Sequence, residues 1–222
     1  GQVELRVEDF DGIIDLSEIG IDEALVKSIN KVGIIACGTA FHAGMVGKYI
    51  IEDLARIPVE VEIGSEFRYR SPIIQPGQLV IIISQSGETA DTLAAMREAK
   101  KRGAKIAAIV NVVGSTISRE ADAVLYTHAG PEIAVASTKA YNTQLIAIYM
   151  IALELGRLSG ALDAERYARL AEGLSQVPSL MDKVLETKPQ LARVASRSFS
   201  QSSVFFIGRG LDYVLSMEAS LK

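Results

Sequence analysis

The chain has 222 residues, about one and a half times the length of a typical domain. Apolar residues make up 49% and charged residues 23%, which excludes a disordered or fibrous protein and predicts one sizeable core. With 23 Lys and Arg against 27 Asp and Glu, the net charge of −4 argues against a binder of nucleic acid or of anionic membranes.

The cysteine and histidine counts limit the redox and metal chemistry of the chain. Cys37 is the only cysteine, so no internal disulfide and no multi-cysteine zinc site can form, and two histidines do not suggest a metal centre. Residues 1–12 do not have the pattern of a signal peptide, and the apolar stretch 145–153 is shorter than the ~20 residues of a membrane span. We therefore expect a cytoplasmic protein without a metal ion.

Short apolar runs alternate with amphipathic stretches from residue 31 onward, after a lead-in segment (1–30) with one short helix over 17–30. Continuous apolar runs such as residues 80–83 are typical of strands that are covered on both faces. The pattern predicts an α/β fold of three αβα layers with a five-stranded parallel sheet, doubly wound and flavodoxin-like. The predicted strands are 32–36, 59–63, 79–84, 106–111 and 123–127.

Helices are expected between these strands and after the last one. Pro178 and Pro189 are expected to interrupt the helical region near the end of the chain. The predicted helices are 39–56, 89–102, 115–120, 140–158, 163–175 and 180–200.

A weak internal repeat relates residues 34–39 to residues 205–210, since both are apolar runs that lead into a glycine turn and a helix. In the best register Gly38 corresponds to Gly210. We therefore expect a first domain at 31–200 and the beginning of a second copy at 201–222. Because the sequence lacks an initial Met and ends within a predicted helix, we expect a piece of a longer protein.

The turn after the third predicted strand is the most informative segment. Ligands of open parallel sheets bind beyond the carboxyl ends of the strands, and hydroxyls, an amide and free N–H groups at a helix N-terminus can hold a phosphate. No Lys or Arg lies between residues 71 and 96, so neutral donors would hold it. The residues concerned are Ser84, Gln85, Ser86 and Thr89.

These residues have a structural alternative, because Ser and Thr often only cap helices and shape turns. Glu88 would repel a phosphate unless its side chain points away. The motifs of nucleotide P-loops and of dinucleotide-binding folds are absent. The pattern is therefore adequate for a sugar phosphate or a similar metabolite, and no cofactor is predicted.

The turn at residues 36–40 follows the first predicted strand. Gly38 allows close approach of the backbone, and Thr39 offers a hydroxyl. Cys37 could be a nucleophile with His42 as its base, but a small buried thiol near a turn is the favoured interpretation.

Two further features have alternatives that the residues alone leave open. The loop 132–139 contains hydroxyls, among them Ser137, that could cap the next helix or contact a sugar, and capping is favoured. Glu218 and Lys222 lie four residues apart on one helix face, where an exposed ion pair is the default interpretation. His128 is expected to be structural, as is His42.

Five segments together resemble the phosphosugar isomerase (SIS) domains of the glutamine:fructose-6-phosphate aminotransferase family, also called glucosamine-6-phosphate synthases. The resemblance runs from about residue 32 to residue 222. The matching segments are ACGT at 36–39, SEFRYR at 65–70, SQSGETADTL at 84–93, VASTKA at 135–140 and GRG at 208–210.

The resemblance implies an SIS fold and a sugar-phosphate site. In the family a glutaminase domain releases ammonia, and two tandem SIS domains convert fructose 6-phosphate and ammonia to glucosamine 6-phosphate. It assigns the phosphate to the four residues of the turn at 84–89 and the sugar to Thr39, the Val135 backbone and Ser137. It also implies a homodimer with residues 65–70 near the interface, although these could equally form a helix packed on their own sheet.

The catalytic residues are covered only in part by the resemblance. Glu218 and Lys222 match the start of a catalytic helix motif, while the glutamate, histidine and lysine that complete the chemistry in the family would lie beyond Lys222. Ala40 stands where the family usually has a serine that contacts the sugar. We therefore expect a fragment of such an enzyme that binds fructose 6-phosphate, glucose 6-phosphate or glucosamine 6-phosphate but is inactive by itself.

Two alternatives come from other classes. A non-catalytic SIS module that senses sugar phosphates for a DNA-binding partner is one, but the chain shows no helix-turn-helix pattern and no basic patch. A related deglycase acting on phosphorylated sugar-amine adducts is the other. The coding sequence on either side of this segment would separate the three.

Overall fold

A five-stranded parallel sheet forms the centre of the computed structural model, which describes residues 12–134 and 136–222. Its strand order, β2-β1-β3-β4-β5, is that of flavodoxin-like, doubly wound folds, so the predicted fold class is confirmed. The strands are β1 (Lys31–Ala36), β2 (Val59–Ile63), β3 (Gln78–Ser84), β4 (Lys105–Val110) and β5 (Ala123–Tyr126).

Both faces of the sheet are buried. Successive side chains of the central strands point to opposite faces, and each face is covered by an apolar cluster. Ile34 and Ile81 belong to the larger apolar cluster, and their neighbours Ile35 and Ile82 belong to a second cluster on the other face. This is why the central strands are continuously apolar in sequence rather than alternating.

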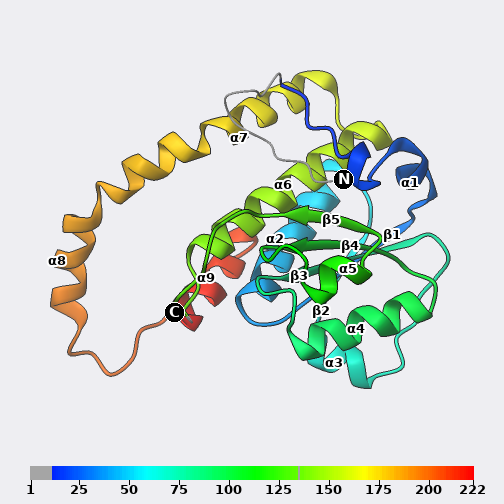
Figure 1. The fold of residues 1–222 in the computed structure, drawn as a ribbon. Coiled ribbons are helices and arrows are strands. Elements are labelled where there is room, and N and C mark those ends of the chain that lie inside the picture. The colour runs from blue at the N-terminus through cyan, green and yellow to red at the C-terminus, as the bar shows by residue number, and fades with distance from the viewer. Residues whose placement is uncertain (1–11, 135) are drawn as a thin grey trace.

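Helices cover the two faces as separate layers (Figure 1). The larger cluster packs under α1, α2, α6 and the start of α7, whereas α3, α4 and α5 cover the other face. The helices are α1 (Glu23–Ser28), α2 (Thr39–Leu54), α3 (Gly64–Tyr69), α4 (Ala90–Lys101), α5 (Thr116–Glu120), α6 (Lys139–Ser159), α7 (Ala164–Leu185), α8 (Lys188–Ser198) and α9 (Leu211–Leu221).

The predicted lead-in helix over 17–30 is split in the structure. A 3₁₀ turn, Ser17–Ile19, ends at Gly20, and α1 then begins after Asp22, whose carboxylate accepts the N–H of Leu25. Residues 1–11 of the predicted segment lie outside the described residues. The lead-in packs on the same apolar cluster as α2 and α6, since Ile14 and Leu16 are fully buried there.

Segment 65–70 is largely the short helix α3, which packs on its own sheet. Phe67 is buried in the second apolar cluster, while Tyr69 is 78% exposed. Arg70 forms an ion pair with Glu62 of β2. Phe67 is therefore a core residue.

The predicted break at Pro178 is wrong. α7 runs through Pro178 as far as Leu185, and the chain turns only at Glu186 and Thr187, before Pro189 opens α8. A proline removes one backbone donor from a helix, and the other hydrogen bonds of a 22-residue helix can tolerate that loss. None of the described helices has the length and apolar character of a membrane span.

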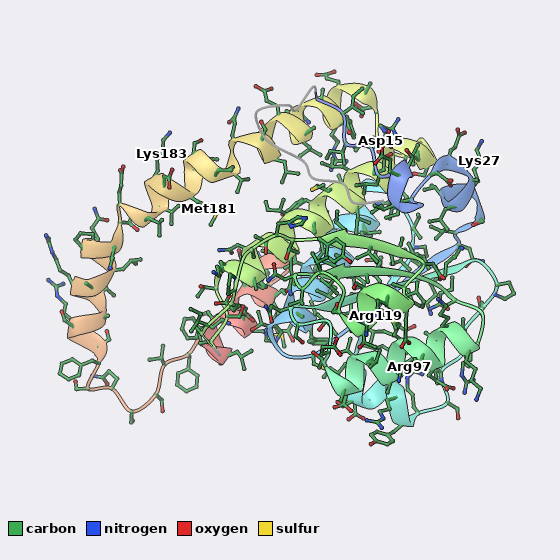
Figure 2. The ribbon with its side chains drawn as sticks, in the orientation of Figure 1. Asp15, Lys27, Arg97, Arg119, Met181 and Lys183 are labelled. Carbon is green, nitrogen blue, oxygen red and sulfur yellow. The ribbon has the colours of Figure 1, made fainter. Side chains whose placement is uncertain are left out.

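The end of the chain returns to the sheet after a long excursion. Figures 1 and 2 show α8 and the outer half of α7, which carries Met181 and Lys183, extending away from the body before α9 comes back beside α2. α8 buries no residue. The apolar run at residues 205–207, which corresponds to the first predicted strand in the internal repeat, forms no strand. No described strand pairs with this segment, and Phe205 and Ile207 are exposed.

The glycine turns of the predicted repeat nevertheless have the same backbone geometry. Gly38 before α2 has φ 57° and ψ −133°, and Gly210 before α9 has φ 62° and ψ −131°. Both values lie in a region that residues with a side chain rarely adopt. The two glycines that the predicted register pairs therefore form the same turn before a helix, and the second domain copy stays a prediction.

Candidate sugar-phosphate site

A cavity of about 230 Å³ opens at the carboxyl ends of β1 and β3. The strand order reverses between these two strands, and in doubly wound sheets the ligand crevice forms at such a point. The cavity brings together six of the side chains singled out from the sequence: Thr39, Ser84, Gln85, Ser86, Thr89 and Ser137. Its other lining residues are Cys37, Ala40, Ile83, Thr92 and Gln144.

Hydroxyls and amide groups crowd the turn between β3 and α4. Ser84 Oγ lies 3.0 Å from Thr89 Oγ1 and accepts the N–H of Gly87, and Ser86 Oγ accepts the N–H of Glu88. Thr89 is the N-cap residue of α4, yet its side chain makes no capping hydrogen bond. The capping interpretation therefore does not account for Thr89, and the positive end of the α4 dipole is open to an anion.

Glu88 points away from the cavity. Its Oε1 accepts the backbone N–H of Thr116 at 2.6 Å, at the start of α5. This hydrogen bond, together with that of the Thr116 side chain, lowers the pKa of Glu88 below its usual value. The carboxylate that could have repelled a phosphate is thus held against a neighbouring helix.

Four side chains from α2 and from the end of the chain form a cluster that includes Thr39, which lines the cavity. Glu218 of α9 accepts a hydrogen bond from Thr39 at 3.1 Å, lies 2.6 Å from His42 Nδ1 and forms an ion pair with Lys222 at 2.8 Å. The ammonium of Lys222 also donates to Thr39 Oγ1 at 3.0 Å. The expected ion pair is therefore formed, but its carboxylate is not at the surface, since Glu218 is only 5% exposed.

This cluster changes the electrostatics of the site. Among the described residues that line the cavity none is charged, but Lys222 places a cation next to Thr39, which does line it. Burial, followed by the negative charge of Glu218, raises the pKa of Tyr141 to about 12. Tyr141 is thus a neutral hydroxyl beside the cluster.

Among the described residues, no base contacts the thiol of Cys37 as a nucleophile would need. Its Sγ is approached by the hydroxyl of Thr92 at 3.5 Å, while His42, the base considered from the sequence, pairs with Glu218. The half-buried thiol therefore forms part of the cavity wall. His128 follows β5 with a positive φ of 47°, and its ring contacts that of Tyr126.

The loop before α6 is organised by Glu132, which the sequence did not single out. Its Oε2 accepts the hydroxyl of Ser137 and the backbone N–H groups of Thr138 and Ala140. The N–H of Ala140 is the largest cause of the lowered pKa of Glu132. A carboxylate rather than a hydroxyl thus caps α6, and Ser137 is held at the cavity; Val135 lies outside the described residues.

Gln144 is a further lining residue that sequence reasoning missed. It lies on α6 and is 3% exposed. A polar residue directly before the apolar stretch 145–153 is a signal that could have marked it. Among the described residues no group of three or more His, Cys, Asp or Glu side chains is placed to hold a metal ion.

Comparison with known proteins gives the family. The model of the SIS domain matches residues 25–154. A glutamine–fructose-6-phosphate aminotransferase (isomerizing) from Clostridium tetani is 57% identical over 209 residues, which are 94% of this chain and 34% of that protein. The protein of the same name from Symbiobacterium thermophilum is 50% identical over 98% of this chain and 36% of its own length. The chain thus spans about a third of these curated relatives.

Solved structures agree with this assignment. The C-terminal domain of a glucosamine-fructose-6-phosphate aminotransferase from Francisella tularensis is similar with a TM-score of 0.91 and 38% identity, over 96% of this chain and 59% of that one. A putative phosphosugar isomerase from Bacillus subtilis, at 22% identity and a TM-score of 0.74, shares the fold over 92% of this chain and 64% of its own. With the crevice at the end of β1 and β3 and the family model over more than half of its length, this chain belongs to the SIS domain family.

Proposed function

We propose that this chain binds fructose 6-phosphate as the sugar-phosphate-binding part of a glutamine–fructose-6-phosphate aminotransferase. The observation that carries the proposal is that neutral hydroxyl and amide groups line the crevice between β1 and β3. They lie at the N-terminus of α4, which has no side-chain capping hydrogen bond. The high identity to aminotransferases over nearly the whole chain supports the same reaction class.

Neutral donors suffice for a metabolite phosphate. A hydrogen bond to a charged group contributes about 1.5–3 kcal/mol, so four or five can give micromolar to millimolar binding after desolvation and ordering costs. In this proposal Ser84, Gln85, Ser86 and Thr89 hold the phosphate. Rotation of the Ser84 and Thr89 hydroxyls, which now bond each other, would turn them toward the ligand.

The sugar end of the ligand is proposed to lie against Thr39 and Ser137. Glu218 and Lys222 hydrogen-bond the Thr39 hydroxyl, and Glu132 accepts a hydrogen bond from the Ser137 hydroxyl. These contacts orient two hydroxyl groups without any movement of the backbone. The Val135 backbone, assigned to the sugar by the family resemblance, stays a prediction.

Binding without turnover is the expected behaviour of the chain alone. Isomerisation between a ketose and an aldose moves a proton between C1 and C2 and needs a base within hydrogen-bond reach. The described residues that line the cavity include no carboxylate, histidine or lysine, and Glu218 contacts it only through Thr39. The bases that complete the reaction are proposed to belong to other parts of the full enzyme.

Titration calorimetry tests the proposal. Fructose 6-phosphate should bind the chain, and free fructose should bind at least a hundredfold more weakly, because most of the contacts go to the phosphate. The double variant Ser84→Ala/Ser86→Ala should lose most of the binding. The matched control, Ser175→Ala/Ser179→Ala on α7, should bind normally, since those hydroxyls donate to backbone carbonyls of their own helix and do not line the cavity in the described part of the chain. Equal affinity for fructose and its phosphate would refute the proposal.

The oligomeric state, the further domain and the cellular location are proposed from the relatives and the family. We expect a homodimer, an upstream glutaminase domain in the full protein and a cytoplasmic location, which the single thiol fits. Tyr69 of α3 is the exposed member of segment 65–70 and could lie at a dimer interface. Light scattering of the wild type and of Tyr69→Ser tests the dimer: a monomeric wild type would contradict it.

A further inference from the structure

Three buried side-chain polar atoms among the described residues have no hydrogen-bond partner, and all three are near the candidate site. Ser115 Oγ lies against Gly87 of the β3–α4 turn, and Tyr141 Oη lies within the electrostatic influence of Glu218. Gln144 Oε1 belongs to a residue that lines the cavity itself. Unpartnered buried polar atoms are rare in native proteins, so such a group at one site requires a physical reason.

Gln144 is the member of this group whose position points to a ligand. It lies on the buried side of α6, where its buried neighbours Tyr141, Ala147 and Ile148 are mainly apolar. Leaving the oxygen of a buried amide without a donor typically costs about 1–3 kcal/mol. An apolar side chain at residue 144 would avoid this cost, so the amide is unfavourable for the ligand-free fold.

The chemistry of the amide fits a sugar. A primary amide has one acceptor and one donor end, and rotation about its last torsion exchanges them. Gln144 therefore can present either end to a ligand that enters the cavity. Gln144 shares the cavity wall with Thr39 and Ser137, and Ala40 on that wall adds no polar side-chain atom.

We propose that the Gln144 side chain is a specificity-determining contact that hydrogen-bonds a hydroxyl or carbonyl oxygen of the sugar chain. The inference rests on the proposed function, because that function puts the phosphate at the β3–α4 turn and the sugar at this wall. Gln144 then favours a polyhydroxylated phosphate ester over inorganic phosphate, which reaches only the turn.

The test compares two probes on one variant. Gln144→Met keeps the length of the side chain and the helix propensity but removes both ends of the amide. Calorimetry should find fructose 6-phosphate bound about tenfold to a hundredfold more weakly by the variant, and inorganic phosphate bound as by the wild type. The neighbouring Thr143→Ala, whose hydroxyl bonds the backbone of its own helix, is the control and should leave both affinities unchanged.

A second measurement separates a binding role from a structural one. Without ligand, Gln144→Met should melt at the temperature of the wild type or above it, because an unpartnered buried oxygen has been removed. A clearly lower Tm would mean that the amide stabilises the fold, and would overturn the inference. An unchanged affinity for fructose 6-phosphate, or an equal loss for both probes, would also overturn it while leaving the proposed function intact. A wild type that binds neither probe would refute the proposed function itself.

Discussion

Gly87 has the most constrained backbone of the β3–α4 turn. Its φ is +66°, and a Cβ at this residue would lie 2.1 Å from Ser115 Oγ. Its carbonyl accepts the N–H of Ile117 and so joins the turn to α5. Any side chain here must both adopt a left-handed backbone and displace Ser115.

Gly87→Ala should therefore lower the free energy of unfolding by more than the about 1–2 kcal/mol of left-handed strain alone. Gly103→Ala is the matched control, since Gly103 also has a positive φ but no atom of the described residues lies within 4 Å of its Cβ position. Urea denaturation of both variants gives the two costs. Equal costs would show that the contact with Ser115 is easily relieved.

Glu132 should make the stability of the fold depend on pH. Because its pKa is lowered in the folded chain, its carboxylate stabilises the fold above the unfolded pKa of about 4.3, and this contribution disappears as the pH falls through the lower, folded pKa. Glu132→Gln should lower the Tm at pH 7, and the difference from the wild type should shrink toward pH 3. Glu172→Gln, an exposed change on α7, should show no such trend. A difference for Glu132→Gln that is constant between pH 7 and pH 3 would contradict this account.

Local chemistry made some of the site's residues predictable from the sequence. Ser84, Ser86 and Thr89 follow an apolar strand and open a helix, and that pattern needs no knowledge of distant parts of the chain. Glu132 and Gln144 could not be found in this way. Glu132 acts by hydrogen-bonding back to the start of α6, and Gln144 is recognised because its side-chain oxygen has no partner among the described residues.

At the level of elements, the five strands were predictable because each is a short apolar run bounded by turns, and their bounds differ by at most one residue from those expected. Two helical features were not. Pro178 lies inside α7, since the remaining backbone bonds of the helix persist around it, and the segment at 205–207 is not a strand because strand formation depends on a pairing partner.

We expect the packing of α9 on α2 to depend on Glu218, because its carboxylate contacts Thr39 and His42 of α2. Glu218→Ala removes the partner of His42, Thr39 and Lys222 at once, so we expect a loss on the order of 2 kcal/mol in unfolding free energy. Hydrogen exchange should become faster in α9 before it does in the sheet. Asp212→Asn, an exposed change at the start of the same helix, should have a small effect. Equal protection of α9 in wild type and Glu218→Ala would contradict this role.

This docking illustrates what sequence spacing cannot give. The spacing of Glu218 and Lys222 places them on one helix face, which is correct, but it does not say whether that face is in water or against another helix. The partner residues, Thr39 and His42, lie more than 170 residues earlier in the chain. Only the tertiary structure joins the two segments.

On the scale of the whole molecule, the layers follow from the alternation of strands and helices, so a crevice at the carboxyl ends of the strands could also be expected. Figure 2 shows the side chains of Arg97 and Arg119 on the α4 and α5 side of the sheet, whereas Met181 and Lys183 lie on the extending helix α7. The direction of that extension was not predictable, because α8 has no buried face in the described chain that would fix it.

The central claim is that uncharged donors at the end of β3 hold the phosphate group of the sugar ester. A crystal structure of the chain soaked with fructose 6-phosphate tests it most directly. We predict the phosphorus atom at the N-terminus of α4, with its oxygens within hydrogen-bond distance of Ser84, Ser86 and Thr89. Phosphate density elsewhere on the molecule, with the β3–α4 turn unchanged and unoccupied, would contradict the claim.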